Sequence, residues 1–161
     1  MLVATKPLTS LTAADLMSRE VTAISRHLSL RSAAHLLSQA HVSGAPVVDA
    51  RGSCVGVISS TDFVHWAEGS RPSRSHGPHF ECACSDWQVF DSDELPEEEV
   101  GTYMTEDPVT ATPNTSVGEM ARMMIDAHIH RIIIVDEGNR PVGVVSSTDI
   151  LGAVAASEFQ S

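Results

Sequence analysis

The sequence predicts a mixed α/β protein made of two β-α-β-β-α repeats that pack sheet to sheet with pseudo-twofold symmetry. The main observation is a repeated stretch: Gly-Val-Ile-Ser-Ser-Thr-Asp, which ends at Asp62, recurs as Gly-Val-Val-Ser-Ser-Thr-Asp, which ends at Asp149. The same separation of 87 residues relates many other positions of the chain. One such sheet is too small to bury its own apolar face, so the two copies are expected to share a core.

The first repeat is predicted to cover 11–67. Apolar residues from Leu30 onward recur at i, i+3, i+4 and i+7, which is the pattern of one buried helical face. Asp49 and Gly52 are typical turn residues, and they separate two short apolar segments. The expected elements are a strand at 21–24, a helix from 30 to about 41, a hairpin of strands 45–48 and 55–58, and a helix from 61.

The second repeat is predicted to cover 98–156 and to contain the same elements. Aligning 109–111 with 21–23 requires one residue of slack between the copies. The long helix that follows is expected to start at a capping box formed by Ser116 and Glu119. The predicted buried face of this helix holds Val117, Met120, Ala121 and Met124.

Each repeated motif is predicted to run from a buried strand into a helix start, where it presents hydroxyls and a carboxylate. The first residues of a helix have unpaired N–H groups and the positive end of the helix dipole, so a polar ligand can be held there. The alternative interpretation is that Ser60 and Thr61, like Ser147 and Thr148, only cap their helices.

Composition disfavours several classes of protein. The formal charge of −11 argues against nucleic acid and membranes as partners, because anionic partners require clustered Lys and Arg. No apolar run reaches the length of a signal peptide or a membrane span, so a cytoplasmic location is expected. The chain has no Gly-x-Ser-x-Gly, phosphate-loop, His-Glu-x-x-His or Cys-x-x-Cys motif, which predicts a protein that is not an enzyme.

Taken together, the two repeats resemble a tandem pair of CBS (cystathionine beta-synthase) domains, an arrangement called a Bateman module. The resemblance covers about 11–66 and 98–155. It rests on the Met-Ser or Met-Thr opening, the Val-Thr-Ala strand, the amphipathic helix, the apolar strand that ends in Val-Asp, and Gly-Val-x-Ser-x-x-Asp. The resemblance implies the fold already predicted, and it implies binding of adenosine-containing ligands such as AMP, ADP, ATP or S-adenosylmethionine.

The resemblance also implies candidate ligand residues. The family's ribose contacts fall on Ser59 and Asp62 in the first copy, and on Ser146 and Asp149 in the second. A carboxylate can accept hydrogen bonds from neighbouring ribose hydroxyls, and a missing hydroxyl would leave that acceptor unpaired. The residues that resemble the family's base and ribose lining are Thr22, Ala23, Thr110 and Ala111.

The two copies differ where a phosphate is expected. His130 and Arg131 resemble the phosphate-contacting His-Arg of the gamma subunit of AMP-activated protein kinase, whereas the first copy has Ser43 and Gly44. Arg131 offers a planar fork for phosphate oxygens, and His130 offers a titratable donor. We therefore expect the second cleft to bind nucleotide phosphates better than the first. The alternative is that both residues simply begin an exposed strand.

An acidic insert, 68–97, separates the repeats and is rich in Pro, Ser, Asp and Glu. His76, His79, Cys82 and Cys84 lie within nine residues of this insert, and they are ligand types that suit zinc, although their spacing is not a familiar zinc spacing. The insert is therefore a candidate metal site or, alternatively, a mobile acidic loop.

The function predicted from the sequence is a non-enzymatic regulatory module that binds adenosine-containing ligands and transmits energy or metabolite state to an effector protein. The resemblance also suggests a homodimer, formed through the helices after the two motifs. Two alternatives remain: a metal- or redox-responsive interaction protein that senses through His76 to Cys84, and a purely structural dimerisation module. The apolar residues expected on the dimer face are Phe63, Val64, Trp66, Ile150, Leu151 and Val154.

Overall fold

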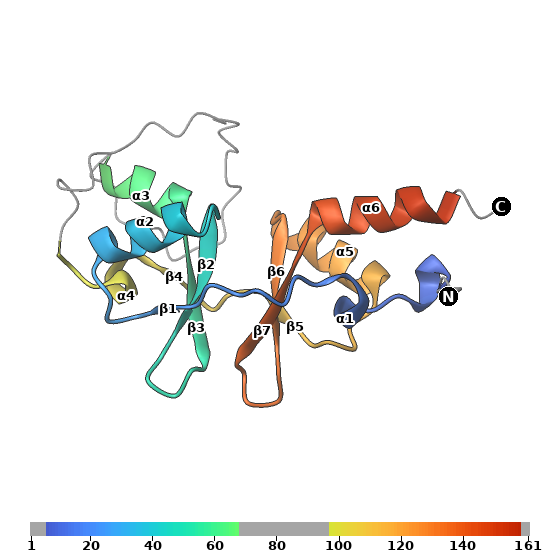
Figure 1. Ribbon diagram of the computed structural model, residues 1–161, viewed down its shortest axis with the longest axis horizontal. Helices are drawn as coiled ribbons and strands as arrows, with labels where there is room; N and C mark the ends of the chain where they lie inside the picture. Colours follow the sequence, from blue (N-terminus) through green and yellow to red (C-terminus); the bar gives the residue numbers. More distant parts are fainter. Residues whose placement is uncertain (1–5, 68–96, 159–161) are drawn as a thin grey trace. The chain divides into compact units, whose positions relative to one another are not determined.

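The computed structural model describes residues 6–67 and 97–158, and it has the predicted mixed α/β architecture (Figure 1). The chain divides into two compact units, which we name after their motif carboxylates. The Asp62 unit is Thr22–Pro108, and the Asp149 unit combines Met1–Val21 with Val109–Ser161. Both units contain the predicted succession of strand, helix, two strands and helix.

The Asp62 unit contains a four-stranded sheet. Its elements are β1 (Ile24–Ser25), α2 (Leu30–Gln39), β2 (Gly44–Val48), β3 (Cys54–Ser59), α3 (Ser60–Ala67), α4 (Val100–Tyr103) and β4 (Thr105–Glu106). The strand order is β1-β2-β3-β4, with β1 parallel to β2 and the other pairs antiparallel. Helices α2 and α3 pack on this sheet, and Leu30, Leu37 and Ile58 are at most 2% exposed in the core between them (Figure 1).

The Asp149 unit contains a three-stranded sheet. Its elements are η1 (Leu8–Ser10), α1 (Ala13–Leu16), β5 (Thr110–Ala111), α5 (Val117–Ala127), β6 (Arg131–Val135), β7 (Pro141–Ser146) and α6 (Ser147–Glu158). The strand order is β5-β6-β7, with β5 parallel to β6 and β6 antiparallel to β7. Met120, Ile132, Ile134 and Val145 are fully buried between the sheet and its helices.

Short polar side chains fix the turns and helix starts. In the hairpin between β2 and β3, Oδ1 of Asp49 accepts hydrogen bonds from the N–H groups of Arg51 and Ser53, at 2.9 and 3.0 Å. The hydroxyls of Ser29 and Ser116 each accept a 3.2 Å bond from the N–H three residues later, so they cap α2 and α5. The predicted turn after β2 and the predicted start of α5 are therefore confirmed.

The ends of α2 and α5 share an uncommon backbone conformation. His41 and His128, which follow these helices, both have a φ of 53°. This left-handed region is the usual end of a helix, but it favours glycine. The predicted end of the first long helix near His41 is confirmed.

The opening segments of the two repeats, 11–18 and 98–106, each pack in the unit that holds the long strands of the other repeat. The repeat pattern does not predict this exchange. In the Asp149 unit, Ser18 and Val144 exchange two backbone hydrogen bonds of 3.0 Å. In the Asp62 unit, β4 pairs with β3, and Val100 of α4 is fully buried in the core. Each unit is therefore built from both repeats.

The sheet register corrects the repeat alignment at its first strand. β1 and β5 pair with β2 and β6 at positions that keep the separation of 87: Ile24 opposite Val47, and Ala111 opposite Ile134. The predicted residue of slack is therefore wrong, and the counterpart of Thr110 is Ala23 rather than Thr22. The alignment of the two identical Val-Thr-Ala sequences, 21–23 and 109–111, is therefore one residue out of register with the strand pairing.

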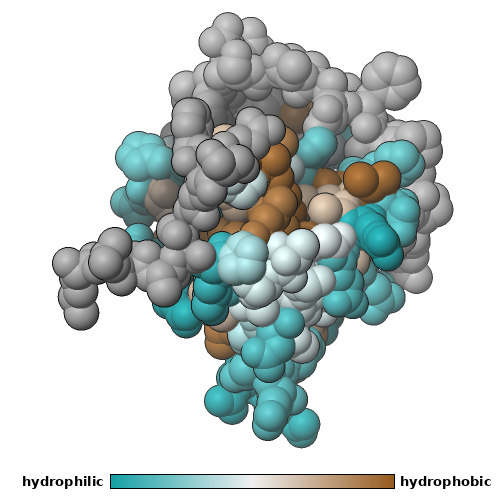
Figure 2. Space-filling model, turned by 90° about the vertical axis from the view of Figure 1, so that its right-hand side faces the viewer, coloured by the Kyte–Doolittle hydropathy of each residue, from teal (hydrophilic) through white to brown (hydrophobic). Residues whose placement is uncertain are grey.

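Two apolar residues expected on a dimer face are instead buried inside their own units. Phe63 and Ile150 are 8% and 9% exposed and belong to the two cores. Each helix must bury one face on its sheet, and Trp66, three residues after Phe63, also packs on that side. Leu151 and Val154, by contrast, are exposed on α6. Figure 2, coloured by hydropathy, shows that apolar residues (brown) form part of the surface and lie beside polar residues (teal).

Candidate functional site

The second motif forms a closed pair of side chains where β7 runs into α6. Oδ2 of Asp149 accepts a 2.7 Å hydrogen bond from the backbone N–H of Ser146 and a 2.8 Å bond from its hydroxyl. The N–H of Asp149 in turn donates to Oγ of Ser146 at 3.2 Å. This reciprocal pattern is a capping box. The capping role that the sequence offered to Ser147 and Thr148 therefore belongs to Ser146.

The first motif has the same two bonds to the carboxylate where β3 runs into α3. Oδ2 of Asp62 accepts hydrogen bonds from the N–H and the hydroxyl of Ser59, at 2.7 and 3.2 Å. Within 6–67 and 97–158, Asp62 is the one buried polar or charged residue, with 7% of its surface exposed. A buried carboxylate needs compensating donors, and Ser59 supplies two of them.

The pair in the Asp149 unit leaves one carboxylate oxygen for a ligand. Both side-chain hydrogen bonds of Asp149 end on Oδ2, so Oδ1 accepts none from the described part of the chain. Asp149 is also less buried than Asp62. An oxygen in this position, at the start of a helix, is suited to accept hydrogen bonds from neighbouring hydroxyls.

Strand pairing brings the predicted phosphate residues to the second motif. Arg131 lies directly opposite Ser146 in the antiparallel pair of β6 and β7. The C=O of His130 accepts a 2.8 Å hydrogen bond from the N–H of Ser147, the first residue of α6. Side chains opposite one another in antiparallel strands lie on the same face, with Cβ atoms about 5 Å apart. The structure therefore gathers His130, Arg131, Ser146 and Asp149 at one end of the hairpin.

Arg131 and Ser146 share the face of the sheet that is turned away from α5 and α6. Ile132 and Ile134 of β6 are fully buried in the core under these helices. Successive side chains of a strand point to opposite faces, so Arg131 points to the other face, and Ser146 with it. We call this the open face of the unit, because the unit's own helices α5 and α6 do not cover it, although Ile133 on this face is only 6% exposed.

The predicted base-lining residues do not all lie on the open face. Thr110 pairs with Ile133, the third residue of β6, and therefore shares the face of Arg131. The side chain of Ala111 is 6% exposed and belongs to the core. In the Asp62 unit the corresponding residue is Ala23, and Thr22 precedes it. The open face thus has a threonine hydroxyl in one unit and a methyl group in the other.

The Asp62 unit has no side chain where the Asp149 unit has Arg131. Gly44 lies opposite Ser59, and the C=O of Ser43 accepts a 2.8 Å hydrogen bond from the N–H of Ser60. A Cβ on Gly44 would lie 3.1 Å from the carbonyl oxygen of Ile58 and 3.2 Å from Cβ of Ser59. The two strands of the hairpin are therefore closely packed at this point. The Asp62 unit has the same backbone arrangement as the Asp149 unit, but it lacks the cationic side chain.

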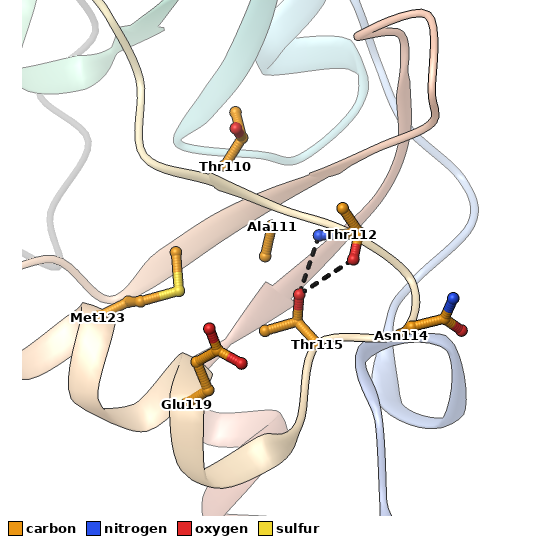
Figure 3. A pocket seen from close by; sticks show the side chains of 7 residues that line it. All are labelled: Thr110, Ala111, Thr112, Asn114, Thr115, Glu119 and Met123. Carbon is orange, nitrogen blue, oxygen red and sulfur yellow. Dashed lines mark hydrogen bonds between the residues drawn. The ribbon is translucent and has the colours of Figure 1, made fainter.

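A shallow pocket of about 410 Å³ lies beside β5 and the first turns of α5 (Figure 3). Oγ1 of Thr115 accepts a 3.0 Å hydrogen bond from the N–H of Thr112 and lies 3.2 Å from its hydroxyl oxygen. Two residues that line the pocket, Thr110 and Ala111, were candidates from the sequence. The other lining residues are not identical between the two repeats, so the repeat did not mark them. The full lining is Thr110, Ala111, Thr112, Asn114, Thr115, Glu119 and Met123.

The predicted metal ligands His76, His79, Cys82 and Cys84 lie outside the described residues. In the two described ranges, no group of three or more His, Cys, Asp or Glu side chains is placed to hold a metal ion. Cys54 is buried in the Asp62 unit, and this burial raises the pKa of its thiol. Among the helices of the described chain, none combines the length and the apolar character needed to cross a bilayer.

Comparison with protein families gives a match in each repeat. A family model described as CBS domain matches residues 13–69 and 100–156. Among curated proteins, the chloroplastic CBS domain-containing protein CBSX2 of Arabidopsis thaliana is 26% identical over 132 residues, which are 78% of this chain and 55% of that protein. The gamma-3 subunit of 5'-AMP-activated protein kinase of Sus scrofa is 30% identical over 116 residues, 72% of this chain and 20% of that subunit.

Solved structures share the fold. CBSX2 in complex with AMP has a TM-score of 0.69 at 21% identity, and the match covers 91% of this chain and 98% of that one. The CBS domain pair of protein MJ0100, in complex with 5-methylthioadenosine and S-adenosyl-L-methionine, has a TM-score of 0.68 at 22% identity and covers 91% of this chain and 97% of that one. The chain spans about half the length, or less, of the curated relatives named above.

Proposed function

Because this chain belongs to the CBS domain family, we propose that it is a non-enzymatic regulatory protein that binds an adenosine-containing ligand: AMP, ADP, ATP or S-adenosylmethionine. Related CBS pairs have been solved with AMP and with S-adenosyl-L-methionine, which supports this class of ligand. The observation that carries the proposal is the placement of Arg131 directly opposite Ser146, whose N–H and hydroxyl hold the carboxylate of Asp149.

In the proposed complex, the ribose lies at the start of α6. Its hydroxyls donate to Oδ1 of Asp149, whose other oxygen is held by the N–H and hydroxyl of Ser146. The capping box thus fixes the carboxylate before the ligand arrives, which reduces the ordering cost of binding. Thr110, on the same open face, contributes to the lining of the base and ribose. Ser59 and Asp62 have the equivalent role in the other unit.

The phosphate group of a nucleotide is assigned to the Asp149 unit. Arg131 presents a guanidinium that can bind two phosphate oxygens, and His130 adds a ring N–H donor. The Asp62 unit offers Ser43 and Gly44 at these positions, so we propose that it binds phosphates weakly and suits an uncharged adenosine group. The module is therefore asymmetric in the ligands that it prefers.

Regulation requires a second molecule. A ligand that binds one arrangement of the protein better than another shifts the population toward that arrangement. We propose that the ligand-bound protein acts on an effector protein in the cytoplasm. We also propose that it forms a homodimer, with the exposed Leu151 and Val154 of α6 contributing to the dimer contact.

The test is thermal unfolding of the protein with AMP, ADP, ATP, S-adenosylmethionine and GTP as a control. A ligand present at about 100 times its dissociation constant adds roughly 2.7 kcal/mol to the free energy of unfolding, which raises Tm by several degrees. We expect a shift with adenosine ligands and none with GTP. Asp149→Ala should remove the shift produced by AMP, whereas Asp62→Ala should keep most of it, each compared with its own ligand-free Tm.

Two results would contradict the proposal. One is the absence of any shift with all four adenosine ligands. The other is an equal shift with AMP in the wild-type protein and in Asp149→Ala, because the carboxylate would then not contact the ribose.

A further inference from the structure

The glycine of each repeated motif lies directly under a methionine. A Cβ on Gly56 would lie 2.6 Å from Sδ of Met104 and 2.8 Å from the carbonyl oxygen of Thr105. A Cβ on Gly143 would overlap the side chain of Met17 in the same way. Neither glycine has a positive φ, so their backbone conformation does not require glycine. Each glycine instead leaves the space that the methionine side chain occupies, and we call this position the seat of the methionine.

In both units, the seated methionine comes from the opening segment of the other repeat. Met17 ends α1 and belongs to the first repeat, while Gly143 belongs to the second. Met104 follows α4 of the second repeat and is 6% exposed in the core of the Asp62 unit. The contact therefore connects each ligand motif to a segment of the opposite repeat.

In the Asp149 unit, the opening segment touches both sides of the candidate ligand site. On one side, the backbone of Ser18 pairs with Val144, two residues before Ser146, through two hydrogen bonds of 3.0 Å. On the other side, the N–H of Ala13 donates to the C=O of Thr115 at 2.8 Å, in the turn that follows β5. The segment 11–18 thus joins the strand that carries the ribose-binding pair to the turn beside Thr110.

The Asp62 unit repeats these contacts with residues 98–106. The N–H of Val100 donates to the C=O of Leu28 at 2.8 Å, and the N–H of Gly101 donates to the C=O of Arg26 at 2.9 Å. On the other side, β4 pairs with β3 at Gly56 and Val57. Since two different sequences make the same set of contacts, the arrangement belongs to the architecture and not to one chance packing.

We propose that Met17 and Met104 are positioning residues for the ligand-binding pairs of the opposite repeats, so that docking of an opening segment and ligand binding strengthen each other. The inference rests on the proposed function. Ser146 and Asp149 follow Gly143 by three and six residues, so a displaced glycine moves the ribose-binding pair. By linkage, a ligand that favours the docked segment binds more tightly when the segment is docked.

Chain connectivity gives this coupling a route between the units. Met17 is four residues before Val21, the last residue of its unit before the chain enters the Asp62 unit. Met104 is four residues before Pro108, after which the chain enters the Asp149 unit. A ligand bound in either unit therefore stabilises the docked state of the segment that leads into the other unit. The stretches 17–21 and 104–108 are then the parts of the chain that carry the regulatory signal.

The experiment compares AMP affinity, measured by calorimetry, in four variants. Gly143→Ala should weaken AMP binding about tenfold, within the usual range of couplings between sites, although Gly143 does not contact the ligand. Met17→Ala should also weaken it. The double variant should bind AMP better than Gly143→Ala, because the smaller side chain makes room for the added methyl group. Gly152→Ala, in α6 with nothing within 4 Å of its added Cβ, is the control and should bind AMP normally.

Hydrogen exchange supplies a second readout that does not depend on Gly143→Ala folding. AMP should slow exchange of the Ser18 amide in the wild-type protein, and it should not do so in Met17→Ala. If AMP binds the wild-type protein but its affinity and the Ser18 response are unchanged in both single variants, the coupling is wrong while the proposed function stands. If no adenosine ligand binds the wild-type protein, the proposed function is wrong, and this inference fails with it.

Discussion

The Asp62 and Asp149 units share one backbone plan but differ in what they present on the open sheet face. The Asp149 unit has Thr110 and Arg131 there, whereas the Asp62 unit has Ala23 and Gly44 at the corresponding positions. Both units keep the pair of serine and aspartate at the start of a helix. The hydrogen-bonded pair of serine and aspartate is therefore common to the two units, whereas the cationic side chain occurs in the Asp149 unit alone among the described residues of the two faces.

This difference separates a folding role from a binding role within one motif. The serine and aspartate satisfy backbone groups at a helix start, which each unit requires whether or not a ligand binds. The presence of Ser-x-x-Asp alone is consequently weak evidence for a ligand site. The stronger evidence is what the neighbouring strand adds opposite the serine, and only the Asp149 unit adds a charge there.

The largest expected effect tests whether the two units fold as one. Ile58 and Ile134 are fully buried, one in each core. Replacing either with alanine should cost about 2–5 kcal/mol of unfolding free energy, because a cavity remains. Since each unit contains segments of both repeats, we expect both variants to lower the midpoint of a single urea transition.

Ile125→Ala is the matched control for this pair. Ile125 lies on α5 and is 70% exposed, so its replacement should change the free energy of unfolding by no more than about 0.5 kcal/mol. Two separate transitions, each lowered by one core variant alone, would show that the crossed segments do not join the units into one cooperative structure.

The next effect concerns the charge on the open face. Arg131→Gly gives the Asp149 unit the residue that the Asp62 unit has. Hydrogen bonds to charged groups contribute about 1.5–3 kcal/mol, so the affinity for AMP should fall roughly ten- to a hundredfold. Adenosine, which has no phosphate, is the control ligand, and its affinity should stay the same. Equal losses for AMP and adenosine would mean that Arg131 supports the hairpin and does not bind phosphate.

The sequence was sufficient to predict most of the fold, because the repeat itself carries the signal. The order of elements, the turn at Asp49 and the cap at Ser116 all follow from local patterns that occur twice. In the second motif Ser146, and not the residues after it, proved to be the cap, because strand pairing continues as far as Ser146.

Other features could not be predicted, since they depend on contacts between distant segments. The exchange of opening segments leaves no trace in a repeat pattern, which records similarity and not contact. The seat for Met17 on Gly143 is invisible for the same reason. The pocket residue Thr115 also lacked a signal: its counterpart in the other repeat is Leu28, which is partly buried against the core of the Asp62 unit. Such differences between copies have meaning only once the register is known.

A smaller effect compares the two helix ends. His41 and His128 both have a φ of 53°, a conformation that costs residues other than glycine about 1–2 kcal/mol. His41→Gly and His128→Gly should each stabilise the protein by about 0.5–1 kcal/mol, after the greater flexibility of glycine in the unfolded chain is included. His35→Gly, in the interior of α2, is the control and should destabilise it. Destabilisation at 41 or 128 would mean that the imidazole binds the last carbonyls of the helix.

The smallest expected effect is confined to the opening segment of the Asp149 unit. A hydrogen bond from Lys6, followed by bonds from the N–H and hydroxyl of Thr12, lowers the pKa of Asp15 from 3.8 to about 2. A lowered pKa means that the ionised carboxylate favours the folded state. Its contribution is therefore complete above about pH 4 and is lost as the pH falls toward 2. The corresponding residue of the Asp62 unit is Thr102, which has no charge to lose.

This pH dependence gives the docking of one opening segment a measurable signature. Hydrogen exchange at the Met17 and Ser18 amides should accelerate between pH 4 and pH 2, after correction for the intrinsic rate, by more in the wild-type protein than in Asp15→Asn. The difference should be small, because Asp15 is exposed and water screens its ion pair with Lys6. Identical pH profiles in the two proteins would show that α1 stays docked through its other contacts, without help from the hydrogen bonds that Asp15 accepts.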